Sequence, residues 1–201
     1  MHAAFSLFME RGYAETSTLA IATRAKVSKR DIYAAFPHKH DILTVAVAER
    51  ARRMSQPLAL PTPRSRRAFA ETLAQHGAAM LRELTAPEVA ALYRLAIAES
   101  GRSPEVAAAL DRSGRQPNEA ALTDFLADAQ ANRLIGEGDP TEMTRQFYGL
   151  LLGGVQIALL LRTAPQPNAP TIALRARKAA EALLAIYPRR VRRTPAPAHR
   201  S

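Results

Sequence analysis

Apolar residues recur at intervals of three or four along most of the sequence, and this spacing predicts an all-α protein. A first helix is expected over residues 1–11, two short helices within 16–36, and a longer helix from about 38 to 56. Residues 57–63 contain three prolines and interrupt the pattern, which is typical of a linker. No segment shows the strict alternation of apolar and polar residues that indicates a β-strand.

The helical spacing returns after the linker and continues almost to the C-terminus. Asp139 and Pro140 form a strong helix start, because Asp is a good N-cap and Pro favours the first helical position. From there we expect one long apolar helix through Leu161, whereas Gly114 and Pro117 should interrupt or kink the helix that contains them. The expected helices of this part cover about residues 64–84, 87–101, 103–129, 141–161 and 172–186.

These segments divide the chain into four parts. We expect a small N-terminal domain over residues 1–45, a connecting helix and linker over 46–63, a larger helical domain over 64–187 and a basic disordered tail over 188–201. The net charge of +10 lies at the two ends: residues 1–56 carry 9 Lys or Arg against 5 Asp or Glu, and the tail carries 5 against none. A basic N-terminal domain suits the phosphate backbone of DNA, although a generally basic proteome would give the same balance.

The stretch Thr16–Phe36 has the layout of two short helices joined by a tight turn. We expect Leu19 to supply an apolar position of the first helix and Val27 to be the buried plug of the turn. Ser28 is a good N-cap for the second helix, and Asp31 three residues later completes a capping box. The outer face of the second helix then carries Lys29, Arg30, Tyr33 and Ala34. This layout is typical of a helix-turn-helix that places its second helix in the major groove of DNA.

The sequence contains no cysteine, which excludes a disulfide framework, a thiolate metal site and a cysteine nucleophile. The same absence fits a reducing cytosol, and no signal peptide is recognisable. The longest uncharged apolar run, 147–161, has 15 residues and is short for a membrane span. We therefore expect a cytoplasmic protein without a membrane partner. The sequence has no glycine-rich phosphate loop and no serine or carboxylate placed to partner its histidines, so we expect no enzyme, no catalytic residue, no cofactor and no metal.

The N-terminal part resembles the TetR family of bacterial transcriptional regulators. The matching residues are Ala4, Phe5, Leu7, Phe8, Gly12, Tyr13, Thr16, Ser17, Ile21, Ala22, Val27, Ser28, Ile32, Tyr33, Phe36, Lys39 and Leu43. The remainder is similar to the AefR-like class, through Leu92, Tyr93, Arg94, Leu95, Ala98, Glu99, Pro104, Glu105, Asp139, Pro140, Phe147, Gly149, Leu150 and Leu151. The resemblance implies a homodimeric, ligand-responsive repressor of a double-stranded DNA operator. A small-molecule effector that enters the helical body would move the DNA-binding heads apart.

By position, the resemblance assigns DNA contacts to Thr18, Ser28, Lys29, Arg30, Tyr33, Ala34, His38 and Lys39. Lys29 and Arg30 could read guanine edges through paired donors or only contact phosphate. Asp31 could accept from a cytosine amino group, but the cap is the favoured role. His38, His40 and Asp41 could suggest a metal site, but their spacing offers no common ligand face. A helix start that faces phosphate is the preferred interpretation.

Polar and aromatic residues of the body could line a cavity for the small molecule or be ordinary core. These residues are His76, Met80, Tyr93, Phe125, Gln146, Phe147 and Tyr148. Three glycines within 141–161 cost a helix roughly 1 kcal/mol each, which close helix approach would offset. With the alanine-rich last helix, they indicate a helix pair that packs within one subunit or, as we prefer, against its twin in a second subunit. The expected dimer interface consists of Gly149, Leu152, Gly153, Gln156, Leu160, Ala176, Ala180 and Leu183.

Three departures from the family pattern concern the head. Lys26 occupies the turn position where the family usually has glycine, so a positive φ is expected in a non-glycine residue. Leu19 and Ala20 replace an acidic pair, so the first helix of the motif loses its reciprocal cap. The chain also starts inside the expected first turn, so either the true start lies upstream or the basic arm is missing. These departures leave an alternative open: a helical small-molecule-binding protein with a degenerate head that binds DNA weakly.

Overall fold

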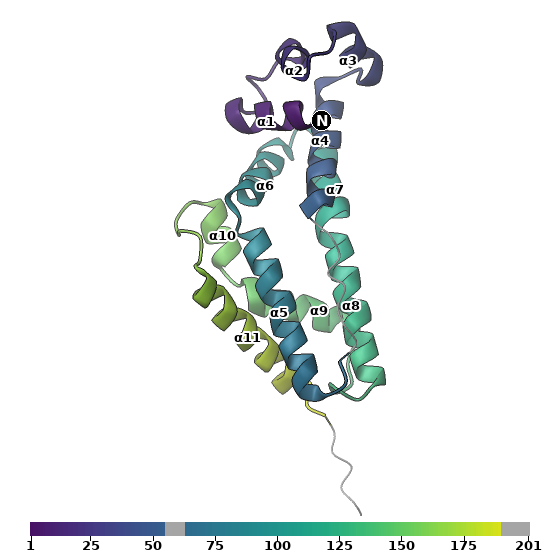
Figure 1. The fold of residues 1–201 in the computed structure, drawn as a ribbon, viewed down its shortest axis with the longest axis vertical. Helices are drawn as coiled ribbons and strands as arrows, with labels where there is room; N and C mark the ends of the chain where they lie inside the picture. Colours follow the sequence, from purple (N-terminus) through teal and green to yellow (C-terminus); the bar gives the residue numbers. More distant parts are fainter. Residues whose placement is uncertain (55–62, 190–201) are drawn as a thin grey trace, which may run out of the picture.

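The computed structural model describes residues 1–54 and 63–189, and all the regular structure in these ranges is helical, as the spacing predicts (Figure 1). The head comprises α1 (His2–Arg11), α2 (Thr18–Ala25) and α3 (Lys29–Ala35), and α4 (Lys39–Met54) leads from it to the body. The body contains α5 (Arg66–Leu84), α6 (Pro87–Glu99), α7 (Pro104–Leu110), the π-helix η1 (Asp111–Arg115), α8 (Gln116–Ala131), α9 (Pro140–Leu152), α10 (Val155–Leu160) and α11 (Ala169–Ile186). Apart from their ends, the expected linker and the expected basic tail lie outside the described residues.

The head and the upper body share one hydrophobic core. Phe8 of α1 and Leu43 of α4 are almost completely buried, and the same cluster includes Leu92 of α6 and Val106 of α7. Burial of each such side chain contributes about 1.5–3 kcal/mol relative to exposure. The head therefore rests on α6 and α7 through packed side chains, so a movement of these helices reaches the head.

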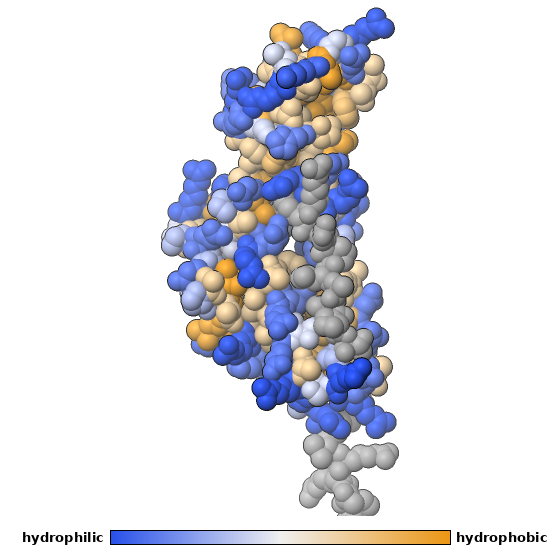
Figure 2. Space-filling view, viewed as in Figure 1, coloured by the Kyte–Doolittle hydropathy of each residue, from blue (hydrophilic) through white to orange (hydrophobic). Residues whose placement is uncertain are grey.

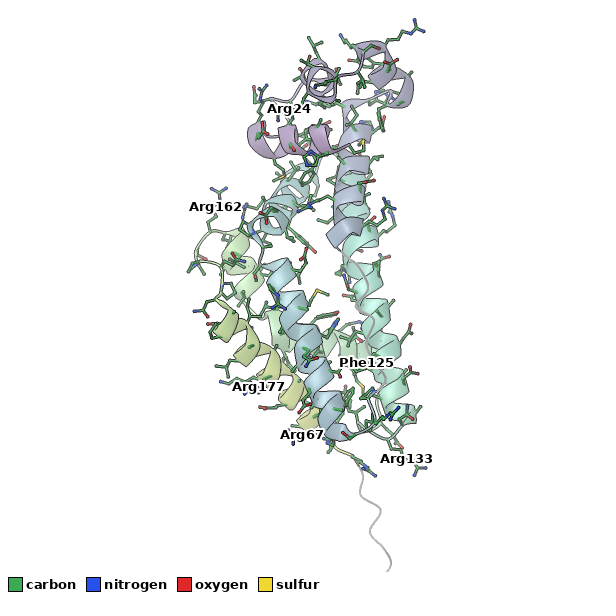
Figure 3. The ribbon with its side chains drawn as sticks, viewed as in Figure 1. Arg24, Arg67, Phe125, Arg133, Arg162 and Arg177 are labelled. Atoms are coloured by element: carbon green, nitrogen blue, oxygen red, sulfur yellow. The ribbon has the colours of Figure 1, made fainter. Side chains whose placement is uncertain are left out.

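A second core holds the lower body together, and α5 and α11 form its longest contact. Gly77 lets the two helices approach closely, because a Cβ atom at this position would lie 3.4 Å from the Cβ of Ala176. Phe125 points from α8 toward α5, where its ring stacks on Phe69 with 5.4 Å between centroids (Figure 3). Within the described ranges, no helix is both long and apolar enough to cross a bilayer.

The prediction of a single helix over 141–161 is wrong, because the structure has two helices, α9 and α10, separated at Gly153. Gly153 adopts φ 47° and ψ −129°, a conformation that side-chain-bearing residues rarely adopt. Arg175 of α11 stabilises the break, since its guanidinium donates to the backbone oxygens of Leu151 and Leu152 at the end of α9. These carbonyls would otherwise lack a helical partner.

The predicted interruption near Gly114 is present in another form. Residues Asp111–Arg115 widen into the π-helix η1, and the chain continues directly into α8 with Pro117 in its first turn. A π-helical turn inside an α-helix often marks a functional site.

Candidate nucleic-acid interface and ligand cavity

The turn of the predicted helix-turn-helix is stabilised at both sides by capping hydrogen bonds. Ser28 Oγ accepts from the backbone N–H of Asp31 at 3.1 Å, and Asp31 Oδ2 accepts from the backbone N–H of Ser28 at 3.2 Å, which confirms the capping box. Lys26 ends α2 with φ 56° and ψ 42°, so the expected positive φ of a non-glycine residue is also confirmed. At the start of α2, Ser17 accepts from Ala20, with no acidic residue in the first turn to return the bond.

Two residues expected in the core of the motif are exposed instead. Leu19 is 58% exposed and Val27 is 44% exposed, so Val27 is not a buried plug. The space between α2 and the rest of the head is already filled by Ile21, Ala22 and Ile32, all of which are buried. Because α2 and α3 are short, each buries only a narrow stripe of side chains.

The outer face of α3 is open to solvent. Lys29, Arg30, Tyr33 and Ala34 are exposed, while Ile32 faces the core. The hydroxyl of Tyr33 lies 3.0 Å from that of Thr18 at the start of α2, and the ammonium of Lys29 lies 5.6 Å from the centre of the Tyr33 ring. Hydrophilic side chains project from this end of the head in Figure 2. The face therefore presents cationic and hydroxyl donors on a helix whose position is fixed by α2.

The start of α4 lies beside the loop that follows α1. Lys39 Nζ donates to the backbone oxygens of Tyr13, at 2.9 Å, and Ala14, at 3.3 Å, and lies 4.3 Å from the centre of the Tyr13 ring. The backbone N–H of His38 donates to Asp41 Oδ2 at 2.9 Å, which caps α4. Among the described residues, no group of three or more His, Cys, Asp or Glu is placed to hold a metal ion.

A cavity of about 250 Å³ lies in the body, below the head. Of the residues expected to line it, Met80, Tyr93 and Tyr148 do so. Sequence reasoning missed most of the polar wall, and the one signal in this region was the interruption expected at Gly114 and Pro117. The other lining residues are Ala51, Ala79, Glu83, Leu84, Val89, Leu110, Gly114, Arg115, Asn118, Glu119, Leu152 and Gln156.

The other expected cavity residues lie elsewhere. Phe125 and Phe147 belong to the packed lower core, and Gln146 accepts a hydrogen bond from the Tyr187 hydroxyl at 3.0 Å. His76 is 3% exposed and lies behind the cavity wall, where its Nε2 is 3.1 Å from the Tyr148 hydroxyl. On α9, Phe147 packs against Gly77 of α5, and Tyr148 is the aromatic residue of this helix that reaches the cavity.

The polar groups around the cavity are held in defined charge states. Burial lowers the pKa of His76 to about 4, so its ring is neutral near pH 7. Burial also raises the pKa of Tyr148 well above its ordinary value, so this hydroxyl stays protonated. Hydrogen bonds that Arg115 donates to Asp111 and then to Glu119, at distances of 2.5 and 2.7 Å, raise the pKa of its guanidinium. The cavity thus has neutral donors and a cation that two carboxylates already neutralise.

The expected dimer interface is wrong in three of its residues. Ala176, Ala180 and Leu183 are fully buried in the core of their own chain, because this face of α11 packs against α5. Leu152 and Gln156 line the cavity, whereas Gly149 and Gly153 are exposed and Leu160 is half-buried.

A different set of apolar residues on the same helices is exposed. They lie on α9, α10, the residue after α10, and α11: Leu150, Ile157, Leu161, Leu174 and Ile186. Hydrophobic side chains are visible at the surface over the region of α10 and α11 in Figure 2. We call these five residues the apolar patch. Large apolar side chains grouped at a surface commonly mark an interaction site.

Two protein families together match most of the chain. Residues 1–46 match the family described as bacterial regulatory proteins, tetR family, and residues 71–189 match the family described as AefR-like transcriptional repressor, C-terminal domain. None of the curated proteins matches this chain.

Solved structures of similar proteins cover almost the whole length. The flavonoid-responsive regulator FrrA is 28% identical, with a TM-score of 0.78 over 94% of this chain and 95% of that chain. A TetR transcriptional regulator from Agrobacterium tumefaciens is 24% identical, with a TM-score of 0.74 over 92% and 91%. The regulator FadR from Bacillus subtilis, in complex with stearoyl-CoA, is 19% identical, with a TM-score of 0.64 over 92% and 95%. At 24% and 19% identity, the last two structures show only that the fold is alike.

Proposed function

Because the chain belongs to the TetR family of bacterial transcriptional regulators, with a C-terminal domain of the AefR-like class, we propose that it is a homodimeric repressor released from a palindromic operator by a small molecule. The observation that carries the proposal is the head, where a capped α3 leaves its basic outer face exposed. This geometry favours a DNA-binding regulator over a small-molecule-binding protein with a degenerate head. We also propose the domain limits 1–45, 46–63 and 64–187, which lie near the ends of the two family matches. Action on a bacterial chromosome requires a cytoplasmic location.

On the operator, α3 lies in the major groove with its outer face toward the bases. The guanidinium of Arg30 and the ammonium of Lys29 are donors suited to the O6 and N7 acceptors of guanine. Ala34 suits apolar contact with a thymine methyl group. Because Tyr33 is hydrogen-bonded to Thr18, the two helices enter the DNA as one unit.

Groups at the start of the helices contact phosphate. Thr18, Ser28 and His38 lie at or next to helix starts, where the helix dipole and free N–H groups attract anions. Lys39 uses two of its three N–H groups on the carbonyls of Tyr13 and Ala14, so one remains for a phosphate oxygen. The ammonium then links the loop after α1 to the DNA backbone.

The apolar patch is the surface on which a second copy packs. A two-fold dimer requires one self-complementary surface on each subunit, and Leu150 of α9 and Leu174 of α11, two residues of the patch, line one shallow depression of the exposed surface. Gly149, which is exposed beside Leu150, allows close approach of the partner's helix. Pairing through this surface presents two copies of α3 to two half-sites of a palindrome.

The effector binds in the cavity. Small-molecule binding by similar proteins supports this assignment: FadR is in complex with stearoyl-CoA, and FrrA is named as flavonoid-responsive. Ala51 of α4 forms part of its wall, and so do Gly114 and Arg115 of η1, which itself packs against α4. A ligand that fills the cavity therefore displaces the helix that carries the head. Differential affinity for one head spacing then shifts the population away from the DNA-binding form.

A gel shift with the intergenic DNA upstream of the gene tests the proposed function. The protein is expected to retard this DNA as a dimer at a concentration that leaves a scrambled duplex free. Absence of a specific complex, with sedimentation showing an intact dimer, would contradict the repressor proposal.

A further inference from the structure

The walls of the cavity are mainly apolar, and the space between them is small and partly open to solvent. Seven of its lining residues are aliphatic, contributed by α4 to α7 and α9: Ala51, Ala79, Met80, Leu84, Val89, Leu110 and Leu152. Its volume of about 250 Å³ lies just below the range of about 300–1,000 Å³ that ligand pockets commonly span. The ligand is therefore compact, and most of its surface is apolar.

The charges around the cavity disfavour an anion. Among the described lining residues, Arg115 is the only cationic side chain, and Glu83 and Glu119 are acidic. Arg115 donates through Nε and Nη2 to Asp111 and through Nη1 to Glu119, so almost all its donors are used. A carboxylate that enters loses its hydration without gaining a free cation, and this costs far more than burial of a neutral group. An ammonium finds no free buried partner either, because the Glu119 carboxylate is paired with Arg115 and Glu83 is exposed to solvent.

The hydroxyl of Tyr148 supplies a movable donor at the wall. Tyr148 OH donates to the backbone oxygen of Asn118 at a long 3.3 Å, and both residues line the cavity. With its proton used in this way, the hydroxyl accepts from Nε2–H of His76 at 3.1 Å. His76 Nδ1 is buried and has no hydrogen-bond partner in the structure. The proton of Tyr148 can therefore turn from the weak bond to a ligand oxygen without disturbing His76.

We propose that the cavity selects an uncharged, compact ring compound with a carbonyl or amide oxygen, which accepts a hydrogen bond from Tyr148, and that it rejects carboxylates of the same shape. The inference rests on the proposed function, since it assigns the chemical class of the effector. The proposal also connects ligand binding to the movement of the head. The ligand oxygen replaces the backbone oxygen of Asn118 as the acceptor for Tyr148. The side chain of Asn118 donates from Nδ2 to the backbone oxygen of Gly114 in η1 at 2.9 Å.

Three ring compounds of nearly identical shape test the charge selection: 2-naphthamide is neutral, 2-naphthoate is anionic and 2-naphthamidine is cationic at pH 7.5. Calorimetric titration of the full-length protein measures their dissociation constants. We expect 2-naphthamide to bind at least tenfold more tightly than either ion. Equal or tighter binding of the carboxylate or the amidine, or no binding of the amide at millimolar concentration, would overturn the proposal.

Two variants test the residues. Tyr148→Phe removes the donor and should weaken 2-naphthamide binding by about three- to tenfold, while naphthalene binding stays unchanged. Tyr187→Phe, which removes a hydroxyl bonded to Gln146, is the matched control and should change neither constant. Glu119→Gln removes one of the two carboxylates that neutralise Arg115, so it should strengthen 2-naphthoate binding at least threefold and change 2-naphthamide binding by less than twofold.

The outcomes separate the ligand class from the proposed function. If Tyr148→Phe binds 2-naphthamide as tightly as the unmodified protein, or if Glu119→Gln leaves 2-naphthoate binding unchanged, the assignment of these residues is wrong. Operator retardation by the same preparations without ligand reports on the regulator function alone. A protein that binds its operator but fails the titrations refutes the ligand class and leaves the regulator proposal intact.

Discussion

The hydroxyl of Tyr33 on α3 lies 3.0 Å from the hydroxyl of Thr18 on α2. The two residues are 15 positions apart, and their contact joins the two helices on the side that faces solvent. On the proposed interface, this pair sets the angle at which α3 enters the groove. Its contribution can be measured because each hydroxyl can be removed with little change in shape.

A double-mutant cycle of Tyr33→Phe and Thr18→Val isolates this contact. We expect each single variant to weaken operator binding by about 0.5–1.5 kcal/mol, the usual net contribution of one hydrogen bond. The double variant should lose less binding free energy than the two single variants together, since the first change already breaks the hydrogen bond that the second would break. Fully additive losses in fluorescence anisotropy titrations would show that the pair does not act together on DNA.

Lys39→Ala should affect both DNA binding and stability. Loss of the phosphate contact should weaken binding to all duplexes equally and reduce the salt slope of log K by about one. Loss of the two hydrogen bonds to the loop after α1 should lower the free energy of unfolding by about 1–2 kcal/mol. Binding measured from 50 to 300 mM salt, with urea unfolding of the same samples, distinguishes the two effects. An unchanged salt slope would leave Lys39 with the structural role alone.

Leu174→Glu should convert the proposed dimer into a monomer. Leu174 is 52% exposed in the single chain and belongs to the apolar patch, so a carboxylate there would be buried without a partner in the dimer. Sedimentation velocity at micromolar concentration is expected to give the monomer mass for this variant. Ala127→Glu, on the exposed face of α8, is the control and should remain dimeric. A Leu174→Glu protein that sediments as a dimer would place the interface elsewhere.

The buried His76 should make the fold sensitive to acid. Its pKa is about 4 in the folded protein and near 6.5 in the unfolded chain, so the folded state favours the neutral ring. The corresponding stability is fully present above pH 6.5 and is lost as the pH falls toward 4. Each pKa unit corresponds to 1.36 kcal/mol. Between pH 7 and pH 5, the free energy of unfolding of the unmodified protein should therefore fall by about 2 kcal/mol more than that of His76→Gln. Equal losses in urea unfolding at the two pH values would show that His76 is not the titrating group.

Local patterns in the sequence were sufficient to predict the head. The capping box at Ser28 depends only on residues within a few positions, whereas the positive φ of Lys26 was expected from the resemblance to the family, which usually has glycine there. Exposure of Val27 could not be predicted from its neighbours, because it depends on how completely Ile21 and Ile32 fill the space below.

The body depends on contacts between distant segments, and two predictions failed here although its helices were expected. The break at Gly153 is stabilised by Arg175, which is 24 residues from the Leu151 carbonyl that it binds. The alanines of α11 were assigned to a partner subunit, but the absence of a side chain at Gly77 allows α5 of the same chain to cover them. A stripe of small residues indicates close helix packing in either case and does not identify the partner helix.

The central claim is that the outer face of α3 reads bases, and the affinity of Arg30→Ala for a panel of single-base operator variants tests it most directly. The account predicts a loss of about 1–3 kcal/mol on the operator and a relaxed preference at one base pair, repeated in both half-sites. Arg67→Ala, at the far end of α5 from the head, is the control (Figure 3). A variant that binds every duplex more weakly but keeps the sequence preference of the unmodified protein would contradict the claim.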